Sequence, residues 1–268
     1  VIVRDRVSTP ARDVWRTLDR LLARVLAARP AGVATPSFVG ASCVGPVDTV
    51  AGSVSPSTIA EWWQFPLRER LAASTGLPAG LDGAAGATLA GERWLGALRD
   101  VDDVVVVLVD DSVESAILTG GGRMVGAHGN AGAVGHLTVE PGGRRCGCGA
   151  RGCLDAYASA TALRAEFGRP LRRATSSTIE RTGIMIARAI ASTAAVLDVT
   201  RFSLGGVVVD TFGAPMLDAV HRELSLRSRL EHLRGLEVDA DVGSVSPLVG
   251  AAAIVRGPRG AVRAIGTG

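Results

Sequence analysis

Apolar residues along this chain follow two periods. Between residues 8 and 28 they recur three or four positions apart, which predicts an amphipathic helix capped by Thr9. Residues 104–109, VVVVLV, are all apolar, which predicts a strand covered on both faces. Strands that alternate with helices predict an α/β fold. The same reasoning predicts helices over 65–75, 82–98, 177–198, 214–224 and 245–256, and strands or strand–turn units over 32–48, 115–125 and 201–206.

The composition fits that fold class. Apolar residues make up 47% of the 268 positions, aromatic residues only 4%, and there are 34 glycines, which suits small-residue layers joined by tight turns. No apolar run has transmembrane length and the first residues lack a signal-peptide pattern, so we expect a cytoplasmic protein without a membrane partner. The net charge of +3 comes from scattered arginines and gives only a weak indication of nucleic-acid binding.

Three of the four cysteines lie within the eight residues CGCGARGC, 146–153. Three cysteines cannot all pair with one another, and a cytosolic location disfavours disulfides. Together with one preceding histidine they offer the four nitrogen and sulfur ligands of a tetrahedral, structural zinc ion, with no open position for a catalytic water. A disulfide or free surface thiols are the weaker alternatives. The predicted zinc ligands are His136, Cys146, Cys148 and Cys153.

The segment GHLTVEPGGRRCGCGARGCLDAYAS, 135–159, resembles the zinc signature of the ROK family of repressors, open reading frames and kinases. Shorter pieces match in the same order along nearly the whole chain, among them GPVD, TGLP, GERW, GAHG, LGG and GAAA. The resemblance implies an actin-like, ribonuclease H-like fold of two α/β lobes around a cleft, with a zinc-binding loop. It also implies that the kinases of the family bind ATP and a hexose in the cleft, whereas its regulators carry an additional N-terminal winged helix-turn-helix.

The resemblance also divides the chain into lobes. Residues 1–98 and 245–268 are expected to form a smaller N-terminal lobe whose first strands are missing from the sequence. Residues 99–244 are expected to form a larger lobe with the zinc loop and a dimerisation surface. We therefore expect a homodimer or a higher homo-oligomer.

Two motifs of the family's kinases are changed here. After TGLP those kinases have Glu-Asn-Asp-Ala-Asn, whose Asp takes a proton from the sugar hydroxyl. Aligned without gaps, Asp82 replaces the Glu, Gly83 the Asn and Ala84 the catalytic Asp, and a methyl group cannot accept a proton. The family's Gly-Thr-Gly-x-Gly phosphate loop becomes DDSVE, Asp110–Glu114, whose carboxylates would repel a triphosphate.

The sugar-binding set of the family is also reduced. Ala133 stands where the family has one Glu, and Asp155 stands for another Glu after the last cysteine. Buried hydrogen bonds supply most of the specificity of a sugar site, so we expect weak hexose binding. The vestigial ligand site would consist of Asp82, His136 and Asp155.

These changes predict that the chain is not an enzyme and has neither catalytic nor nucleotide-binding residues. It would be the effector-sensing and dimerisation domain of a transcriptional regulator, with a sugar-like effector. No helix-turn-helix is recognisable, so DNA would be bound only through a segment absent from this chain. The alternative is an atypical, glucokinase-like ROK sugar kinase that phosphorylates a hexose with ATP through displaced catalytic groups. A stand-alone structural or ligand-sensing module is a third interpretation.

Overall fold

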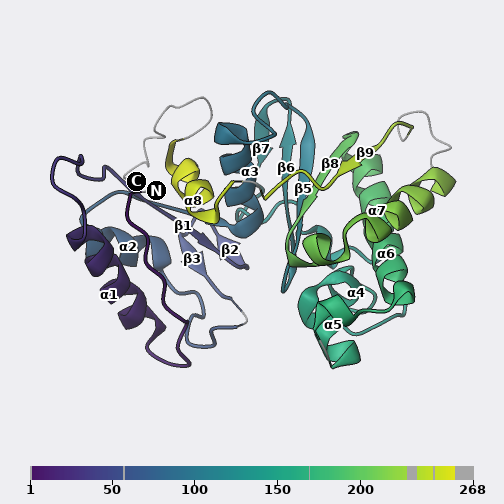
Figure 1. Cartoon of the computed structure of the whole chain (residues 1–268), viewed down its shortest axis with the longest axis horizontal. Helices are drawn as coiled ribbons and strands as arrows, with labels where there is room; N and C mark the ends of the chain where they lie inside the picture. The colour runs from purple at the N-terminus through teal and green to yellow at the C-terminus, as the bar shows by residue number, and fades with distance from the viewer. Residues whose placement is uncertain (1, 57, 169, 228–233, 244, 257–268) are drawn as a thin grey trace.

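The structure, a computed structural model, describes residues 2–256 apart from 57, 169, 228–233 and 244. Its elements fall into two groups along the long axis of the molecule (Figure 1). The predicted mixture of strands and helices is present in both groups. The tail 257–268, which we assigned to the smaller lobe, lies outside the described residues.

The smaller group consists of short paired strands and two helices. Strands β1 and β4 are parallel, with Val39 opposite Ala79, whereas β2 and β3 are antiparallel. One apolar core joins these elements, and it contains Trp62, Leu71 and Leu81. The elements are α1 (Val14–Ala27), β1 (Val39–Cys43), β2 (Val47–Asp48), β3 (Ser53–Val54), α2 (Leu67–Thr75) and β4 (Ala79–Gly83).

Helix α1 begins later than the sequence pattern indicated. It starts at Val14, so the predicted cap Thr9 lies outside it. Instead, the Oε1 atom of Glu61 accepts a hydrogen bond of 2.7 Å from the N–H of Val14. A carboxylate at the first turn satisfies a backbone donor and complements the helix dipole. Because this carboxylate comes from a distant part of the chain, the local pattern could not reveal where the helix starts.

The last helix of the chain returns to the smaller group. Helix α8 (Pro247–Arg256) packs on β1 and β4. It starts two residues after the start of the predicted range 245–256 and ends at the same residue. A Cβ atom on Gly40 would overlap the backbone carbonyl of Ala251. Glycine at this position therefore allows the helix to lie directly on the strand.

A five-stranded sheet in the order β7-β6-β5-β8-β9 organises the larger group. Strand β5 pairs antiparallel with β6 and parallel with β8. Every residue of β5 is buried, as the sequence predicted: Val105 and its alternates face one core, whereas Val104 and its alternates face another. The strands are β5 (Val104–Val109), β6 (Val113–Thr119), β7 (Gly122–Met124), β8 (Arg201–Gly205) and β9 (Glu237–Asp239).

Helices cover both faces of this sheet. Helix α3 packs on one face, and α4 to α7 pack on the other (Figure 1). Helix α7 is kinked at Gly213, which has a φ of 53°. The predicted helix 214–224 corresponds to the part after the kink, and the sequence pattern missed the part before it. The helices are α3 (Ala84–Leu95), α4 (Asp155–Ala158), α5 (Ala160–Phe167), α6 (Ser176–Leu197) and α7 (Val207–Arg227), with 3-10 turns η1 (Val134–His136) and η2 (Leu171–Arg173). None of the described helices combines the length and apolar character needed to cross a bilayer.

Glu92, on α3, is fully buried where the chain passes between the two groups. Its Oε1 atom accepts hydrogen bonds from the N–H groups of Gly243 (3.0 Å) and Val245 (3.2 Å). Its Oε2 atom accepts one from Ala97 at 3.1 Å. Glu92 thus connects the end of α3 with the segment that leads to α8. Since α3 contacts both β5 and α8, the lobe boundaries at 98, 99, 244 and 245 stay a prediction.

Candidate active site

A cavity of about 390 Å³ opens beside the carboxyl end of β5. Its walls come from both groups of elements: Val44, after β1, belongs to the smaller group, whereas Ala84 of α3 and three residues of the turn after β5 belong to the larger one. In α/β proteins the carboxyl ends of strands are the usual place for ligands. The lining residues are Val44, Ala84, Leu108, Asp110, Asp111, Ser112, Glu114, Arg164 and Val207.

Ala84 is the first residue of α3, and a carboxylate from another strand lies against it. Oε2 of Glu114, on β6, accepts a hydrogen bond of 3.1 Å from the N–H of Ala84. Oε1 of Glu114 accepts one of 3.1 Å from the N–H of Gly45 and a long one of 3.5 Å from the hydroxyl of Ser112. Burial raises the pKa of Glu114, although these hydrogen bonds act in the opposite direction. The cavity therefore contains a half-buried carboxylate next to the position where the sequence shows a missing one.

The other acids of this turn also have partners. Oδ1 of Asp110 accepts a hydrogen bond of 2.7 Å from the N–H of Val207, at the start of α7. Asp111 forms an exposed ion pair of 2.5 Å with Arg164. A helix N-terminus and a guanidinium each offset a negative charge. The repulsion that we expected from residues 110–114 is therefore smaller than their sequence indicates.

Asp82 is committed to a different partner. It lies at the end of β4 with 3% of its surface exposed, and Arg123 of β7 donates to both of its oxygens, one of them at 2.8 Å. Asp82 is not among the described residues that line the cavity. The sequence analysis did not identify Arg123 as the partner of Asp82. The only available signal was a charged residue in the largely apolar strand–turn unit predicted over 115–125.

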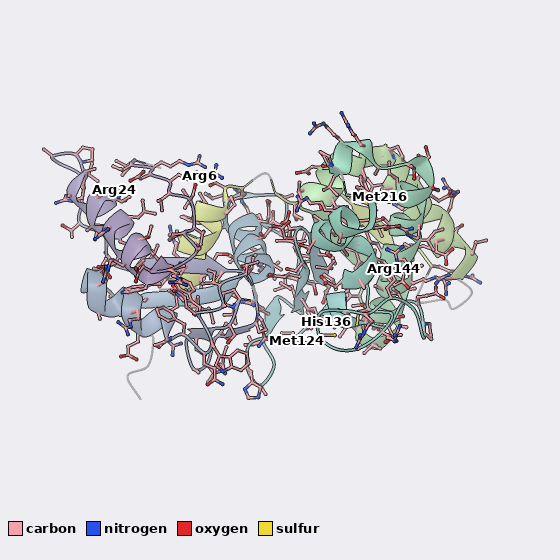
Figure 2. All side chains as sticks on the ribbon, turned by 90° about the horizontal axis from the view of Figure 1, so that it is seen from below. Arg6, Arg24, Met124, His136, Arg144 and Met216 are labelled. Atoms are coloured by element: carbon pink, nitrogen blue, oxygen red, sulfur yellow. The ribbon has the colours of Figure 1, made fainter. Side chains whose placement is uncertain are left out.

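Asp155 and His136 also lie away from the cavity lining. Oδ1 of Asp155, the first residue of α4, accepts a hydrogen bond of 2.8 Å from the N–H of Val113. It thereby links the acidic turn to the cysteine loop. His136 ends η1 and lies near the middle of the molecule in the view of Figure 2. The structure does not gather Asp82, His136 and Asp155 around this cavity, and a vestigial sugar site made of them stays a prediction.

The histidine and the three cysteines of the signature do come together. Their ligand atoms lie within 4.8 Å of one another. Sγ of Cys146 is 3.7 Å from Nδ1 of His136, and the Sγ atoms of Cys148 and Cys153 are also 3.7 Å apart. A tetrahedron with metal–sulfur bonds of about 2.3 Å places its ligand atoms about 3.8 Å apart. The donor set and its dimensions therefore fit a metal ion.

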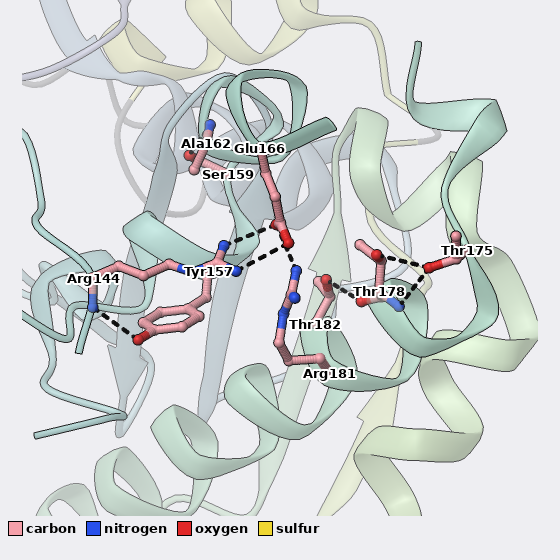
Figure 3. Close-up of polar contacts among 9 residues, drawn as sticks. All are labelled: Arg144, Tyr157, Ser159, Ala162, Glu166, Thr175, Thr178, Arg181 and Thr182. Atoms are coloured by element: carbon pink, nitrogen blue, oxygen red, sulfur yellow. Dashed lines mark hydrogen bonds and ion pairs between the residues drawn. The ribbon is translucent and has the colours of Figure 1, made fainter. Parts of the chain in front are cut away.

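A polar network fixes the cysteine loop to the helices behind it (Figure 3). Glu166 of α5 accepts two hydrogen bonds from Arg144, at 2.8 and 3.0 Å, and one of 2.6 Å from Arg181 of α6. The Arg144 N–H donates to the hydroxyl of Tyr157 at 2.9 Å, and its guanidinium lies 4.8 Å from that ring. The Arg144 hydrogen bond is the main cause that lowers the pKa of Glu166 to about 2. No motif in the sequence indicated this network.

The sequence profile of the ROK family matches residues 1–257. This chain belongs to the ROK family. The family identification and the two-lobed, actin-like α/β fold that it implied are therefore confirmed.

Three relatives place this ROK chain more closely. A glucokinase of Thermotoga maritima is 39% identical over 129 residues, which are 47% of this chain and 40% of the glucokinase. The structure of a ROK hexokinase from Thermus thermophilus has a TM-score of 0.73 and 28% identity, with 92% of this chain and 88% of that one covered. A ROK transcriptional regulator, a homologue of the E. coli MLC protein, has a TM-score of 0.79 and 21% identity, with 90% and 67% covered. The match to the glucokinase thus spans less than half the length of either protein.

The prediction that this ROK chain is not an enzyme is contradicted by these relatives, because they include a glucokinase and a hexokinase. That prediction rested on a missing carboxylate at Ala84 and on an acidic turn assumed to be unpaired. In the structure the carboxylate of Glu114 lies against Ala84, and the acids of the turn have partners. Both are contacts between segments distant in sequence, which the alignment of a short motif could not show.

Proposed function

We propose that this ROK chain forms the substrate cleft of an atypical sugar kinase. The reaction would transfer a phosphoryl group from a nucleoside triphosphate to a hydroxyl group of a hexose or an N-acetylhexosamine. The observation that carries the proposal is the carboxylate of Glu114 inside the cavity, in a chain whose relatives include a glucokinase and a hexokinase. Phosphoryl transfer depends mainly on positioning and on charge stabilisation, with a carboxylate to orient or accept the proton of the nucleophile.

The cavity has features that suit this reaction. Its volume of about 390 Å³ is within the range of small-molecule sites. Asp111 forms an ion pair with the guanidinium of Arg164, and both residues line the cavity. The wall therefore carries positive as well as negative charge. The turn after β5 and the start of α3 both contribute residues to its lining.

The test is direct. The full-length protein is incubated with ATP, Mg²⁺ and a panel of hexoses and N-acetylhexosamines, and both ADP and sugar phosphate are measured, the latter by mass spectrometry. We expect one or a few sugars to yield equal amounts of the two products. ADP release that no sugar increases, with no sugar phosphate formed, would contradict the proposal.

For the His136–Cys146–Cys148–Cys153 cluster we propose a structural Zn²⁺ ion. The four ligand atoms and their spacing support this choice, since zinc favours mixed sulfur and nitrogen ligands in a closed tetrahedron. The ion would stabilise the loop that carries Asp155 toward the acidic turn. Metal analysis of the purified protein measures the stoichiometry, for which we expect one zinc per chain.

A second candidate function is the effector-sensing part of a transcriptional regulator. One observation favours it: Asp110 occupies the N–H of Val207, a helix-terminal donor that a phosphate would otherwise use. The same cleft would then bind a sugar-like effector, and DNA would be bound by a part of the protein outside this chain. Thermal shift with sugars in the absence of nucleotide, together with DNA binding by the full-length protein, tests this candidate; formation of sugar phosphate distinguishes the kinase.

Two further predictions accompany both candidates. The homodimer, with its contact surface in the larger lobe, is tested by light scattering on the purified protein. The cytoplasmic location fits a reaction that uses ATP and is tested by fractionation of cells. The homodimer and the cytoplasmic location both stay predictions.

A further inference from the structure

We propose that Glu114 is the proton acceptor of the reaction and acts from β6 in place of the aspartate that the family's kinases carry at the position of Ala84. This inference rests on the proposed kinase function and names the residue that would perform its proton transfer. Glu114 belongs to the segment that replaces the glycine-rich phosphate loop. The family pattern therefore gives no reason to expect a base there.

The position of the carboxylate is the first argument. Glu114 spans the cavity wall between the N–H groups of Gly45 and Ala84, each 3.1 Å from one of its oxygens. A Cβ atom placed on Gly83 would lie 3.6 Å from Oε2. The carboxylate thus touches the backbone at the first residue of α3, which is where an aspartate at position 84 would begin its own side chain.

The small residues opposite make this arrangement possible. Gly83 has no side chain and Ala84 has only a methyl group, so the longer glutamate side chain can reach them from the neighbouring sheet. The loss of the aspartate and the gain of Glu114 are therefore complementary in space, although 30 residues separate them in sequence. Each change on its own would place either no carboxylate or two carboxylates at this point.

The electrostatic surroundings are the second argument. Among the described residues no arginine, lysine or histidine lies within ion-pair distance of Glu114, whereas Asp82 and Asp111 are both paired with arginines. A carboxylate held by backbone N–H groups and partly buried binds a proton more readily than one paired with a guanidinium. Burial raises the pKa of Glu114, consistent with this environment.

The proposed step conserves atoms and charge. A sugar hydroxyl oxygen forms a bond to the γ-phosphorus of the nucleoside triphosphate, and its O–H bond breaks as the proton passes to the carboxylate of Glu114. The bond between the γ-phosphorus and the bridging oxygen breaks, and its electron pair leaves with the nucleoside diphosphate. Protonated Glu114 then returns its proton to solvent.

The decisive experiment uses Glu114→Gln in the full-length protein, with the exposed Glu69→Gln as a matched control. Glutamine keeps the length and one acceptor oxygen but cannot take a proton, and its NH2 group replaces the acceptor that faces either Gly45 or Ala84. We expect kcat to fall at least about 100-fold, as general-base catalysis implies. The Kd of the sugar, measured by calorimetry without nucleotide, should change less than about threefold, because glutamine preserves the hydrogen bond. Glu69→Gln should leave both quantities unchanged.

A rescue variant separates catalysis from structure. Ala84→Asp in the Glu114→Gln background restores a carboxylate at the same point, and we expect it to recover at least a tenth of the original kcat. Failure of this rescue would overturn the proposal, even if Glu114→Gln also weakens sugar binding or stability. Turnover that survives Glu114→Gln would overturn this inference and leave the kinase function in place. No turnover by the unsubstituted protein with any sugar would overturn both.

Discussion

The cysteine loop and the acidic turn lie at the same end of the larger lobe, yet the sequence predicted them with very different success. In the cysteine loop the four ligand residues lie within 18 positions of one another, and the structure brings their donor atoms together. In the acidic turn the carboxylates of Glu114 and Asp110 accept hydrogen bonds from the N–H groups of Gly45, Ala84 and Val207, which lie between 30 and 97 positions away. A motif with local partners can be interpreted from spacing, whereas the charge of a turn depends on what the rest of the fold places against it.

The largest expected effect is at the cysteine loop. Cys148→Ser removes a metal ligand, so we expect zinc content to fall from about one per chain toward zero. The free energy of unfolding should fall by at least about 3 kcal/mol, because metal binding contributes directly to folding. Elemental analysis and denaturant unfolding measure the two quantities.

Cys43→Ser is the matched control for that variant, since Cys43 lies outside the cluster. It should keep its zinc whatever its effect on stability. An unchanged zinc content in Cys148→Ser would remove this residue from the ligand set.

The second effect concerns the support behind the cysteine loop. Glu166→Gln removes the charge that binds Arg144 and Arg181 and should lower the free energy of unfolding by about 2 kcal/mol at pH 7. The pKa of Glu166 is lowered from 4.5 to about 2, so its contribution is complete above pH 4.5 and is lost as the pH falls toward 2. Unfolding measured from pH 7 to pH 3 should therefore show the difference between wild type and variant becoming smaller. A difference that is constant with pH would contradict this assignment.

Asp155 joins the two compared regions, and its removal should have a smaller effect. Asp155→Ala leaves the N–H of Val113 without its acceptor, which we expect to lower the free energy of unfolding by about 1 kcal/mol. Faster hydrogen exchange of the Val113 amide should accompany this loss. Asp155→Asn retains an acceptor oxygen and serves as the control; equal exchange in both variants would show that the bond does not hold the turn.

The smallest effect is expected within the acidic turn itself. Asp111→Asn breaks the ion pair with Arg164, in which both side chains are largely exposed. Exposed pairs contribute about 0.5 kcal/mol or less, and this contribution decreases with salt. Denaturant unfolding at low and high salt measures it. A loss above about 1 kcal/mol would mean that this pair, like the cysteine loop, is a structural support.

The regular elements with strong patterns were predictable from sequence. The limits of β5 agree with the prediction at both ends, and α6 differs by one residue at each end. The start of α1 was missed because Glu61 caps it from 47 positions away, and three-residue β9 is too short to show a period. In the candidate site, spacing predicted the cluster of one histidine and three cysteines that the structure brings together, but not Glu114, whose significance depends on a contact with Ala84.

The buried carboxylate of Glu92 has a consequence for how the width of the cleft could change. It joins the turn after α3, at Ala97, to the segment before α8, at Gly243 and Val245. The two segments that connect the groups of elements therefore meet at one side chain. Sliding of the two halves at this point would break three hydrogen bonds to a side chain with no access to water, whereas a rotation about it would keep them. The cavity at Ala84 lies at the opposite end of α3, one helix length from the pivot, where a small rotation produces the largest change in width.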